Sequence, residues 1–118
     1  MLSMIDRTKR LSARFYESVS GREPVRSWLL ELDGADRRSL GAAIAKVEFG
    51  WPIGLPSCRP MGNGLFEIRA HISDGRIARV LFGVVNGRMV LLHGFIKKTR
   101  ATPHDDLDLA RKRLKEVS

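Results

Sequence analysis

Hydrophobic and polar residues alternate most clearly in the second half of the chain, where three aliphatic and aromatic runs are separated by two turn signals. The runs cover residues 65–72, 76–85 and 88–97, and the dipeptides between them are Asp-Gly and Asn-Gly. Runs of this length around such dipeptides are typical of β-strands joined by hairpin turns. Residues 62–103 are therefore predicted to contain an antiparallel meander of three strands.

The first half of the chain predicts one further strand and two helices. Alternation over residues 9–19 indicates a half-buried strand. Apolar residues recur with helical spacing over residues 23–32 and 35–49, and the short connection between these helices predicts an αα-hairpin. Residues 50–64 contain three prolines and are expected to form an irregular loop.

A last helix is predicted after the meander, beginning at Thr99 or Thr102 with Pro103 in its first turn. The element order is then βααβββα, in a single α+β domain over residues 1–118. We expect an antiparallel sheet with two helices packed on one face and a C-terminal helix at the end of the chain. The opposite face is expected to stay open unless a partner covers it.

Strand periodicity places the charged residues of the meander on one face of the sheet, because successive side chains point to opposite faces. Burying unpaired arginines is costly, so this face is expected to lie outside the core. Apolar residues, among them Leu81 and Leu91, are interleaved with the charges, which favours a concave site over a plain solvated face. The consistent solution gathers Glu67, Arg69, Arg79, His93, Phe95 and Lys97.

Composition adds a class of partner. The net charge of +8 and the pI near 10.6 indicate an anionic partner, which is a nucleic acid, an acidic protein or a membrane surface. Arginine is commoner than lysine and binds phosphate through paired donors, which favours nucleic acid. No apolar run approaches the roughly 18 residues of a membrane span, and the N-terminus lacks a secretory pattern, so a cytoplasmic location is expected. The only cysteine, Cys58, is interpreted as a partly buried bystander thiol.

The sequence resembles the RelE/ParE superfamily of toxins from bacterial toxin–antitoxin pairs, and most closely its HigB-like branch, which includes phage-type members. The resemblance rests on the predicted element order and on three motifs, and it covers nearly the whole chain from Phe15 onward. It implies a RelE-like fold and an endoribonuclease that cleaves mRNA, often in the ribosome. Because the 2′-hydroxyl of RNA can itself attack the neighbouring phosphate, no metal or other cofactor is expected. The motifs are GLFEIR at 64–69, IARVLF at 77–82 and LLHGFIKKTRATP at 91–103.

The resemblance also implies roles for individual residues. Arg79 matches the arginine that contacts the scissile phosphate, Arg69 matches a basic residue beside it, and Lys97 with Lys98 match a basic cluster after the last strand. A guanidinium suits this task because its donors stabilise the charge on a phosphorane-like transition state. Further RNA contacts are assigned to Arg59, Arg76, Arg100 and His104.

The sequence offers several candidates for the general acid and the general base of this reaction. Members of the superfamily often use a C-terminal tyrosine or histidine, whereas the only tyrosine here, Tyr16, lies in the first predicted strand. No cluster of histidine, cysteine and aspartate has the spacing of metal ligands. The candidates for proton transfer are Lys97, Lys98, His93, His104 and Glu67.

Three functions from different classes fit these observations. The leading hypothesis is an mRNA endoribonuclease toxin that acts at the ribosome and is silenced by an antitoxin with a helix-turn-helix domain. The second is a ParE-like inhibitor that binds DNA gyrase, although such relatives generally lack the catalytic basic residues that Arg69 and Arg79 match. The third is a basic nucleic-acid-binding module without catalysis.

Overall fold

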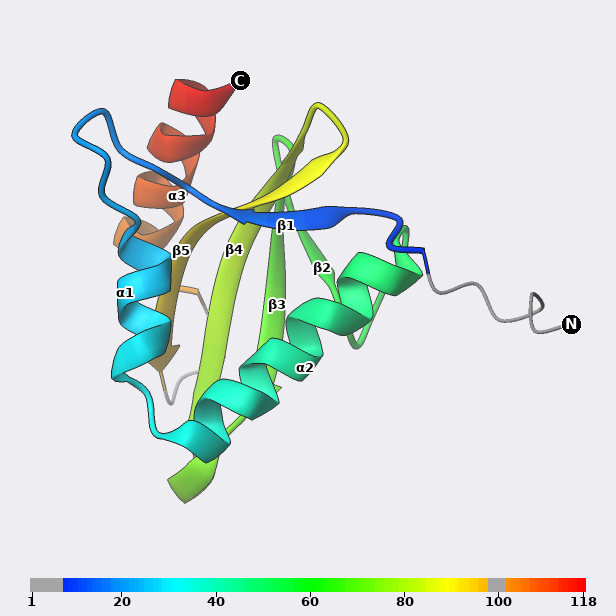
Figure 1. Ribbon diagram of the computed structural model, residues 1–118, viewed down its shortest axis with the longest axis vertical. Helices are drawn as coiled ribbons and strands as arrows, with labels where there is room; N and C mark the ends of the chain where they lie inside the picture. The colour runs from blue at the N-terminus through cyan, green and yellow to red at the C-terminus, as the bar shows by residue number, and fades with distance from the viewer. Residues whose placement is uncertain (1–7, 98–101) are drawn as a thin grey trace, which may run out of the picture.

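The computed structural model describes residues 8–97 and 102–118, and its elements are labelled in Figure 1. These residues form three helices and five strands, and a 3-10 turn at Ser73–Gly75 joins two of the strands. The helices are α1 (Pro24–Glu31), α2 (Gly34–Gly50) and α3 (His104–Val117). The strands are β1 (Ser12–Phe15), β2 (Arg59–Gly62), β3 (Leu65–His71), β4 (Ile77–Val85) and β5 (Arg88–Lys97).

The strands form one sheet in the order β1-β5-β4-β3-β2. The predicted meander is confirmed as β3, β4 and β5, whose neighbours pair antiparallel. Its second hairpin has Asn86 at φ 50° and Gly87 at φ 73°, the left-handed pair that a type I′ turn requires. The prediction of a purely antiparallel sheet is wrong, because β1 pairs parallel to β5.

The predicted order βααβββα also lacks one strand. Strand β2 lies inside the segment that was expected to be an irregular loop, and it pairs antiparallel with β3. The observed order is therefore βααββββα. Pro60 is tolerated there because β2 lies at the edge of the sheet, where one side of the strand needs no ladder hydrogen bonds.

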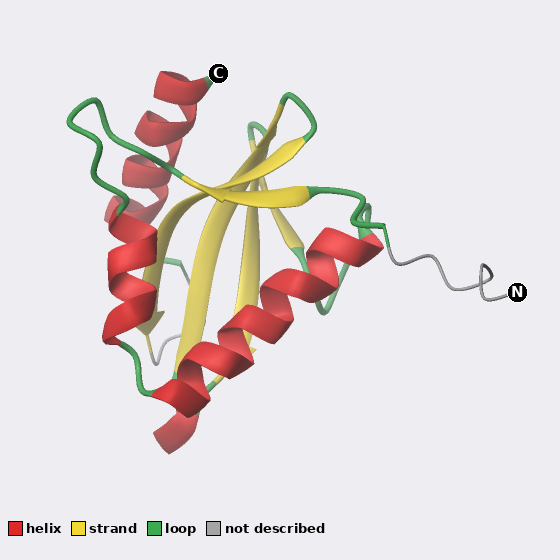
Figure 2. Cartoon of the chain, viewed as in Figure 1, coloured by secondary structure: helices red, strands yellow, loops and turns green. Residues whose placement is uncertain are grey.

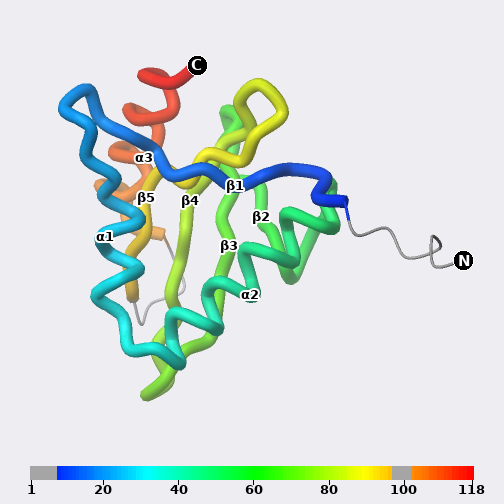
Figure 3. The backbone as a smooth tube through the Cα atoms, in the orientation of Figure 1, coloured from blue at the N-terminus to red at the C-terminus, as the bar shows by residue number. Residues whose placement is uncertain are grey.

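Helices α1 and α2 cover one face of the sheet, as predicted (Figure 2). They do not form a packed αα-hairpin: they diverge from their short connection, and α1 packs on β5 while α2 packs on β3 (Figure 3). The sheet, rather than the other helix, buries the apolar stripe of each. The core on this side contains Val25, Leu40, Ile44, Val47, Ile68, Val80 and Phe82, with the Trp51 ring edge-on to Phe66 at 5.0 Å between centroids.

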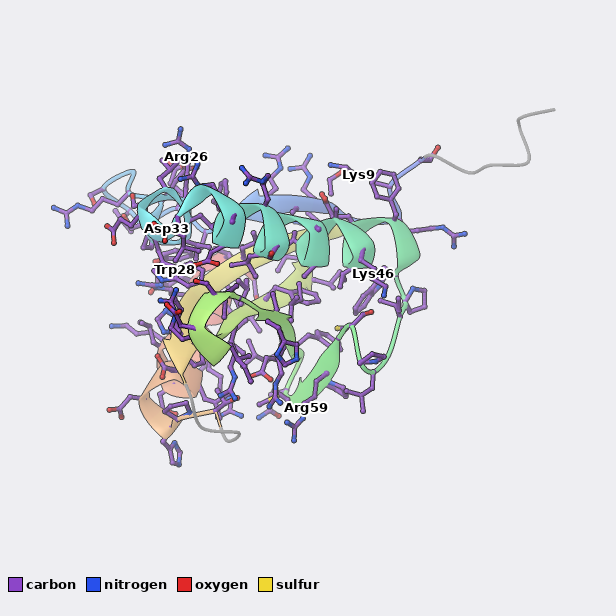
Figure 4. The ribbon with its side chains drawn as sticks, turned by 90° about the horizontal axis from the view of Figure 1, so that it is seen from below. Lys9, Arg26, Trp28, Asp33, Lys46 and Arg59 are labelled. Atoms are coloured by element: carbon purple, nitrogen blue, oxygen red, sulfur yellow. The ribbon has the colours of Figure 1, made fainter. Side chains whose placement is uncertain are left out.

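The close approach of α1 depends on a glycine in β5. A Cβ atom built at Gly94 would lie 2.3 Å from Cζ3 of Trp28, far inside van der Waals contact. The indole, labelled in Figure 4, therefore occupies the space that any larger residue at position 94 would need.

Helix α3 packs on the opposite face, which corrects the expectation that this face stays open. It buries a second core made with the sheet, and Gly83 provides the room, since a Cβ there would lie 2.6 Å from Cδ1 of Leu114. The helix is tied to the residue that follows β1: the Tyr16 hydroxyl donates to Oε1 of Glu116 at 2.5 Å, and Arg113 lies 5.0 Å above the Tyr16 ring. The second core contains Tyr16, Leu65, Leu81, Leu92, Phe95 and Ala110.

An extra residue in β5 changes the predicted faces. Phe82 pairs with Leu91 and the next pair is Leu81 with His93, so Leu92 forms a bulge. Leu91 therefore lies in the core under α1 and α2, while Leu92 lies under α3. The prediction that Leu91 shares the charged face is wrong, because an alternation rule has no place for the additional residue.

Candidate functional site

Charged residues meet on two successive rungs of the sheet, where a rung is a set of residues paired across β3, β4 and β5. Residues directly opposite one another share a face. The rungs lie on the face that carries α3, and their common face agrees with the parity derived from the sequence. They are Glu67–Leu81–His93 and Arg69–Arg79–Phe95.

Glu67 is 1% exposed and holds Arg69 in place. Its Oε1 accepts a hydrogen bond from Nε of Arg69 at 2.7 Å, and its Oε2 accepts one from the hydroxyl of Thr102. Burial of the carboxylate is therefore compensated by two hydrogen bonds, and the one from Arg69 is also an ion pair. Glu67 fixes the guanidinium of Arg69, which remains partly exposed.

Arg79 is fully buried, contrary to the expectation that this face lies outside the core. Burial lowers the pKa of its guanidinium, the nearby Glu67 carboxylate raises it, Arg69 and Arg59 lower it, and Asp106 raises it again. The prediction failed because it treated the arginine as unpaired, whereas carboxylates from β3 and α3 lie close enough to stabilise the buried charge.

His93 is paired with a residue that sequence reasoning missed. Its Nε2 lies 2.6 Å from Oδ1 of Asp106, in the first turn of α3, and its ring stacks on Phe95 with centroids 5.3 Å apart. The His93 side chain is 17% exposed. The sequence does not predict this pair, because no spacing within one element links Asp106 to His93.

Three of the other predicted basic residues lie on β2, at the end of β5 and at the start of α3, and two lie outside the described residues. Arg59 is exposed on β2, opposite Glu67 in the register. His104 is the exposed first residue of α3, and Lys97 ends β5 opposite Ile77. Lys98 and Arg100 lie outside the described residues.

Arg76 lies apart from the rungs, in the turn between β3 and β4. Its Nη2 is 3.0 Å from Oδ2 of Asp36, and Asp36 also accepts hydrogen bonds from the backbone N–H and the hydroxyl of Ser73. These bonds lower the pKa of Asp36, mainly through the Ser73 backbone, and they fasten the turn to the start of α2. RNA contact by Arg76 stays a prediction.

A cavity of about 620 Å³ opens beside the rungs, at the edge of the sheet. β2 pairs with β3 only as far as Glu67, so β3 continues beyond its neighbour, and α2 and the loop after it form the facing wall. Figure 4 shows Lys46 on α2 and Arg59 on β2, two of the lining cations. The full lining is Ala43, Lys46, Leu55, Pro56, Ser57, Arg59, Glu67, Arg69 and His71.

No helix among the described residues has the length and hydrophobicity to cross a membrane. Within residues 8–97 and 102–118, no three side chains of histidine, cysteine, aspartate or glutamate gather as ligands for a metal ion would. The polar side chains on and beside the rungs are arginines, the carboxylates of Glu67 and Asp106, and the imidazole of His93. Such groups suit an anionic substrate and proton transfer.

Comparison with known proteins identifies a family. Residues 27–115 match the protein family described as phage derived protein Gp49-like, while no curated protein matches the chain. The matched region runs from α1 into α3 and includes both rungs and the cavity. The chain therefore belongs to the Gp49-like family of phage-derived proteins, a family of RelE-like, toxin-like character.

Proposed function

We propose that this protein is the toxin of a toxin–antitoxin pair, of the HigB-like branch, and that it is an endoribonuclease that cleaves mRNA at the ribosome. The observation that carries the proposal is the meeting of Arg69, Arg79 and the His93–Asp106 pair on two adjacent rungs. The rungs combine positive charge for a phosphate with a titratable imidazole whose orientation is fixed. Membership of a toxin-like family supports the same assignment.

The reaction uses the substrate's own nucleophile. The 2′-hydroxyl of one nucleotide attacks the adjacent phosphorus, the bond from phosphorus to O2′ forms, and the bond to the 5′ oxygen of the next nucleotide breaks. A base takes the 2′ proton and an acid gives a proton to the leaving oxygen. The products are a 2′,3′-cyclic phosphate and a 5′-hydroxyl end.

His93 is the base that the geometry favours. In a neutral imidazole one nitrogen carries the proton and the other accepts, and the Asp106 carboxylate beside Nε2 favours the proton on that nitrogen. Nδ1 is then left to accept the 2′ proton. Glu67 is less suited because both of its oxygens already accept hydrogen bonds. Lys97, Lys98 and His104 remain the candidates for the proton donor.

Arg69 and Arg79 divide the electrostatic task. Arg69 is partly exposed and held by Glu67, so it is placed to donate to a phosphate oxygen. Arg79 is fully buried in this conformation and reinforces the positive potential from beneath. A fixed charge in a water-poor site stabilises developing negative charge more strongly than an exposed one. Direct contact of Arg79 with RNA would require the residues above it to move.

The proposed partners follow from the same charges. An mRNA phosphate chain is attracted by the net charge of +8, and an antitoxin with an acidic segment would silence the toxin by covering the rungs. A helix-turn-helix domain on that antitoxin is part of the proposal.

Expression in bacteria, with and without the neighbouring gene, tests the proposal. The wild type should arrest growth and produce new mRNA ends in primer extension, and co-expression of an antitoxin should prevent both. Arg69→Ala should lose both effects, while Arg38→Ala, at an exposed position on α2 outside the rungs, should retain them. DNA damage without mRNA cleavage would contradict the proposal and favour gyrase inhibition.

A further inference from the structure

The cavity at the β3 edge is lined by Glu67 and Arg69 of the rungs and also by Lys46 and Leu55, which have no role in the proposed reaction. Cations from three elements line it, namely Lys46 from α2, Arg59 from β2 and Arg69 from β3. The one carboxylate among its described lining residues, Glu67, is already bonded to Arg69 and Thr102. The cavity therefore has excess positive charge and suits an anionic group.

One wall of the same cavity is apolar. Leu55 is 74% exposed and lies beside Pro56 in the loop that follows α2. A flat ring can pack against such side chains while an attached phosphate reaches the cations. The volume of about 620 Å³ falls within the range of small-molecule sites, roughly 300–1,000 Å³.

The strand edge adds hydrogen-bonding groups. In the described part of the chain, the last β2–β3 pair is Arg59 with Glu67, and Ile68, Ala70 and His71 of β3 lie beyond that pair. Backbone N–H and C=O groups at such an edge can bond to the edge of a base. His71, exposed at the end of β3, borders the same space.

We propose that this cavity binds the nucleotide next to the scissile phosphate and thereby sets which RNA sequences are cleaved. The base lies against Leu55 and Pro56, and its phosphate lies between Lys46 and Arg59. The inference rests on the proposed function, and Arg69 provides the link because it belongs both to the rung and to the cavity. An acidic peptide would meet the same cations, but the shared Arg69 and the apolar wall of Leu55 and Pro56 favour a nucleotide.

Two substitutions at exposed positions test the cavity without touching the rungs. Lys46→Ala should raise KM for RNA roughly 10-fold with kcat within about twofold, because it removes a phosphate contact. Leu55→Ala should change the preference for one base beside the cut by roughly 10-fold in a randomised RNA pool. The matched controls are Arg38→Ala, an exposed cation on α2, and Leu30→Ala, an exposed leucine on α1, and both should behave as wild type.

Unchanged KM and unchanged cleavage sites in both cavity variants would overturn the inference. Loss of antitoxin binding with unchanged cleavage would overturn it as well, and would assign the cavity to a peptide. Either result leaves the nuclease proposal intact, so the two claims fail separately.

A binding measurement decides the case in which the wild type cleaves no RNA. The isotope-labelled full chain is titrated with adenosine 5′-monophosphate and with a short RNA that carries 2′-deoxy nucleotides, and amide resonances are followed by NMR. Saturable shifts at Lys46, Leu55 and Ser57, weakened at least about fivefold by Lys46→Ala, support the cavity assignment even without cleavage. No saturable shift at these residues with either probe overturns it.

Discussion

The Nε2 atom of His93 lies 2.6 Å from Oδ1 of Asp106, and this contact joins the middle of β5 to the first turn of α3. It gives the imidazole a fixed orientation beside the Arg69–Arg79–Phe95 rung. The contact also means that the docking of α3 and the arrangement of the candidate base depend on each other.

Removal of the Asp106 charge should lower catalysis through His93. His93→Ala should reduce kcat for RNA cleavage about 100-fold or more, the usual contribution of one proton transfer. Asp106→Asn should reduce it about 10-fold with little change in KM, because the carboxylate orients the base without touching RNA.

The double variant separates positioning from general damage. If Asp106 acts through His93, adding Asp106→Asn to His93→Ala lowers kcat no further. Asp105→Asn, at an exposed position in the same helical turn, serves as the control and should retain wild-type kcat. Additive losses in the double variant would contradict the assignment.

Gly94 should be intolerant of any side chain. Gly94→Ala places a methyl group 2.3 Å from Cζ3 of Trp28, so we expect a loss of about 1–3 kcal/mol in the free energy of unfolding. Urea denaturation measures it. Gly41→Ala is the matched control: no atom lies within 4 Å of its added Cβ, and alanine in a helix should raise stability by about 0.5–1 kcal/mol. Wild-type stability in Gly94→Ala would show that α1 does not pack as described.

Asp36 should make stability depend on pH. Hydrogen bonds from Ser73 and the Arg76 charge lower the pKa of its carboxyl below the ordinary 3.8. The stabilisation is therefore present above pH 3.8 and is lost as the pH falls through the lower, folded value. Asp36→Asn should be less stable than wild type at pH 7, and the gap in urea midpoints should narrow below pH 3.8.

Asp33→Asn controls for the removal of a charge at the start of α2. Asp33 is exposed and its side chain makes no capping hydrogen bond, so at pH 7 its substitution should change the urea midpoint less than Asp36→Asn does. A gap that stays constant with pH in Asp36→Asn would contradict the assigned network.

Cys58 should be unreactive in the folded protein. Burial raises the pKa of its thiol to about 11, from an ordinary 9.0, so little thiolate exists near neutral pH. Iodoacetamide at pH 7.5 should alkylate the native chain at least about tenfold more slowly than the urea-unfolded chain, since the thiolate is the nucleophile. Equal rates, followed by mass spectrometry, would show that the loop around Cys58 opens readily.

The meander and the shared face of Arg69 and Arg79 could be predicted because turn dipeptides and β-branched alternation act over a few residues. The bulge at Leu92 could not be predicted, because both faces of β5 carry apolar residues and leucines would be buried in either register. Strand β2 was not predicted because it contains Pro60. A proline argues against a central strand but is tolerated in an edge strand, and the sequence does not show that β2 lies at an edge. The burial of Arg79 could not be predicted either, because it depends on the charges of Glu67 and of Asp106, and Asp106 is distant in the chain. The apolar stripe of α3 predicts a helix with one buried side, but it does not specify which face of the sheet the helix covers.

The cavity was missed for a related reason. Its lining comes from α2, the following loop, β2 and β3. Lys46 and Leu55 become candidate binding residues only because the fold brings these segments together. The net positive charge predicted an anionic partner but not the position of its contacts.

The most direct test of the central claim uses one RNA in two forms. The purified chain, with ribosomes programmed by that RNA, is incubated with an all-ribose message and with the same message carrying a single 2′-deoxy nucleotide at the mapped cut. Cleavage of the first, leaving a 2′,3′-cyclic phosphate, with no cleavage at that position in the second, is the predicted result. Equal cleavage of both messages, or none of the all-ribose message, would contradict the claim that this site cleaves RNA through its own 2′-hydroxyl.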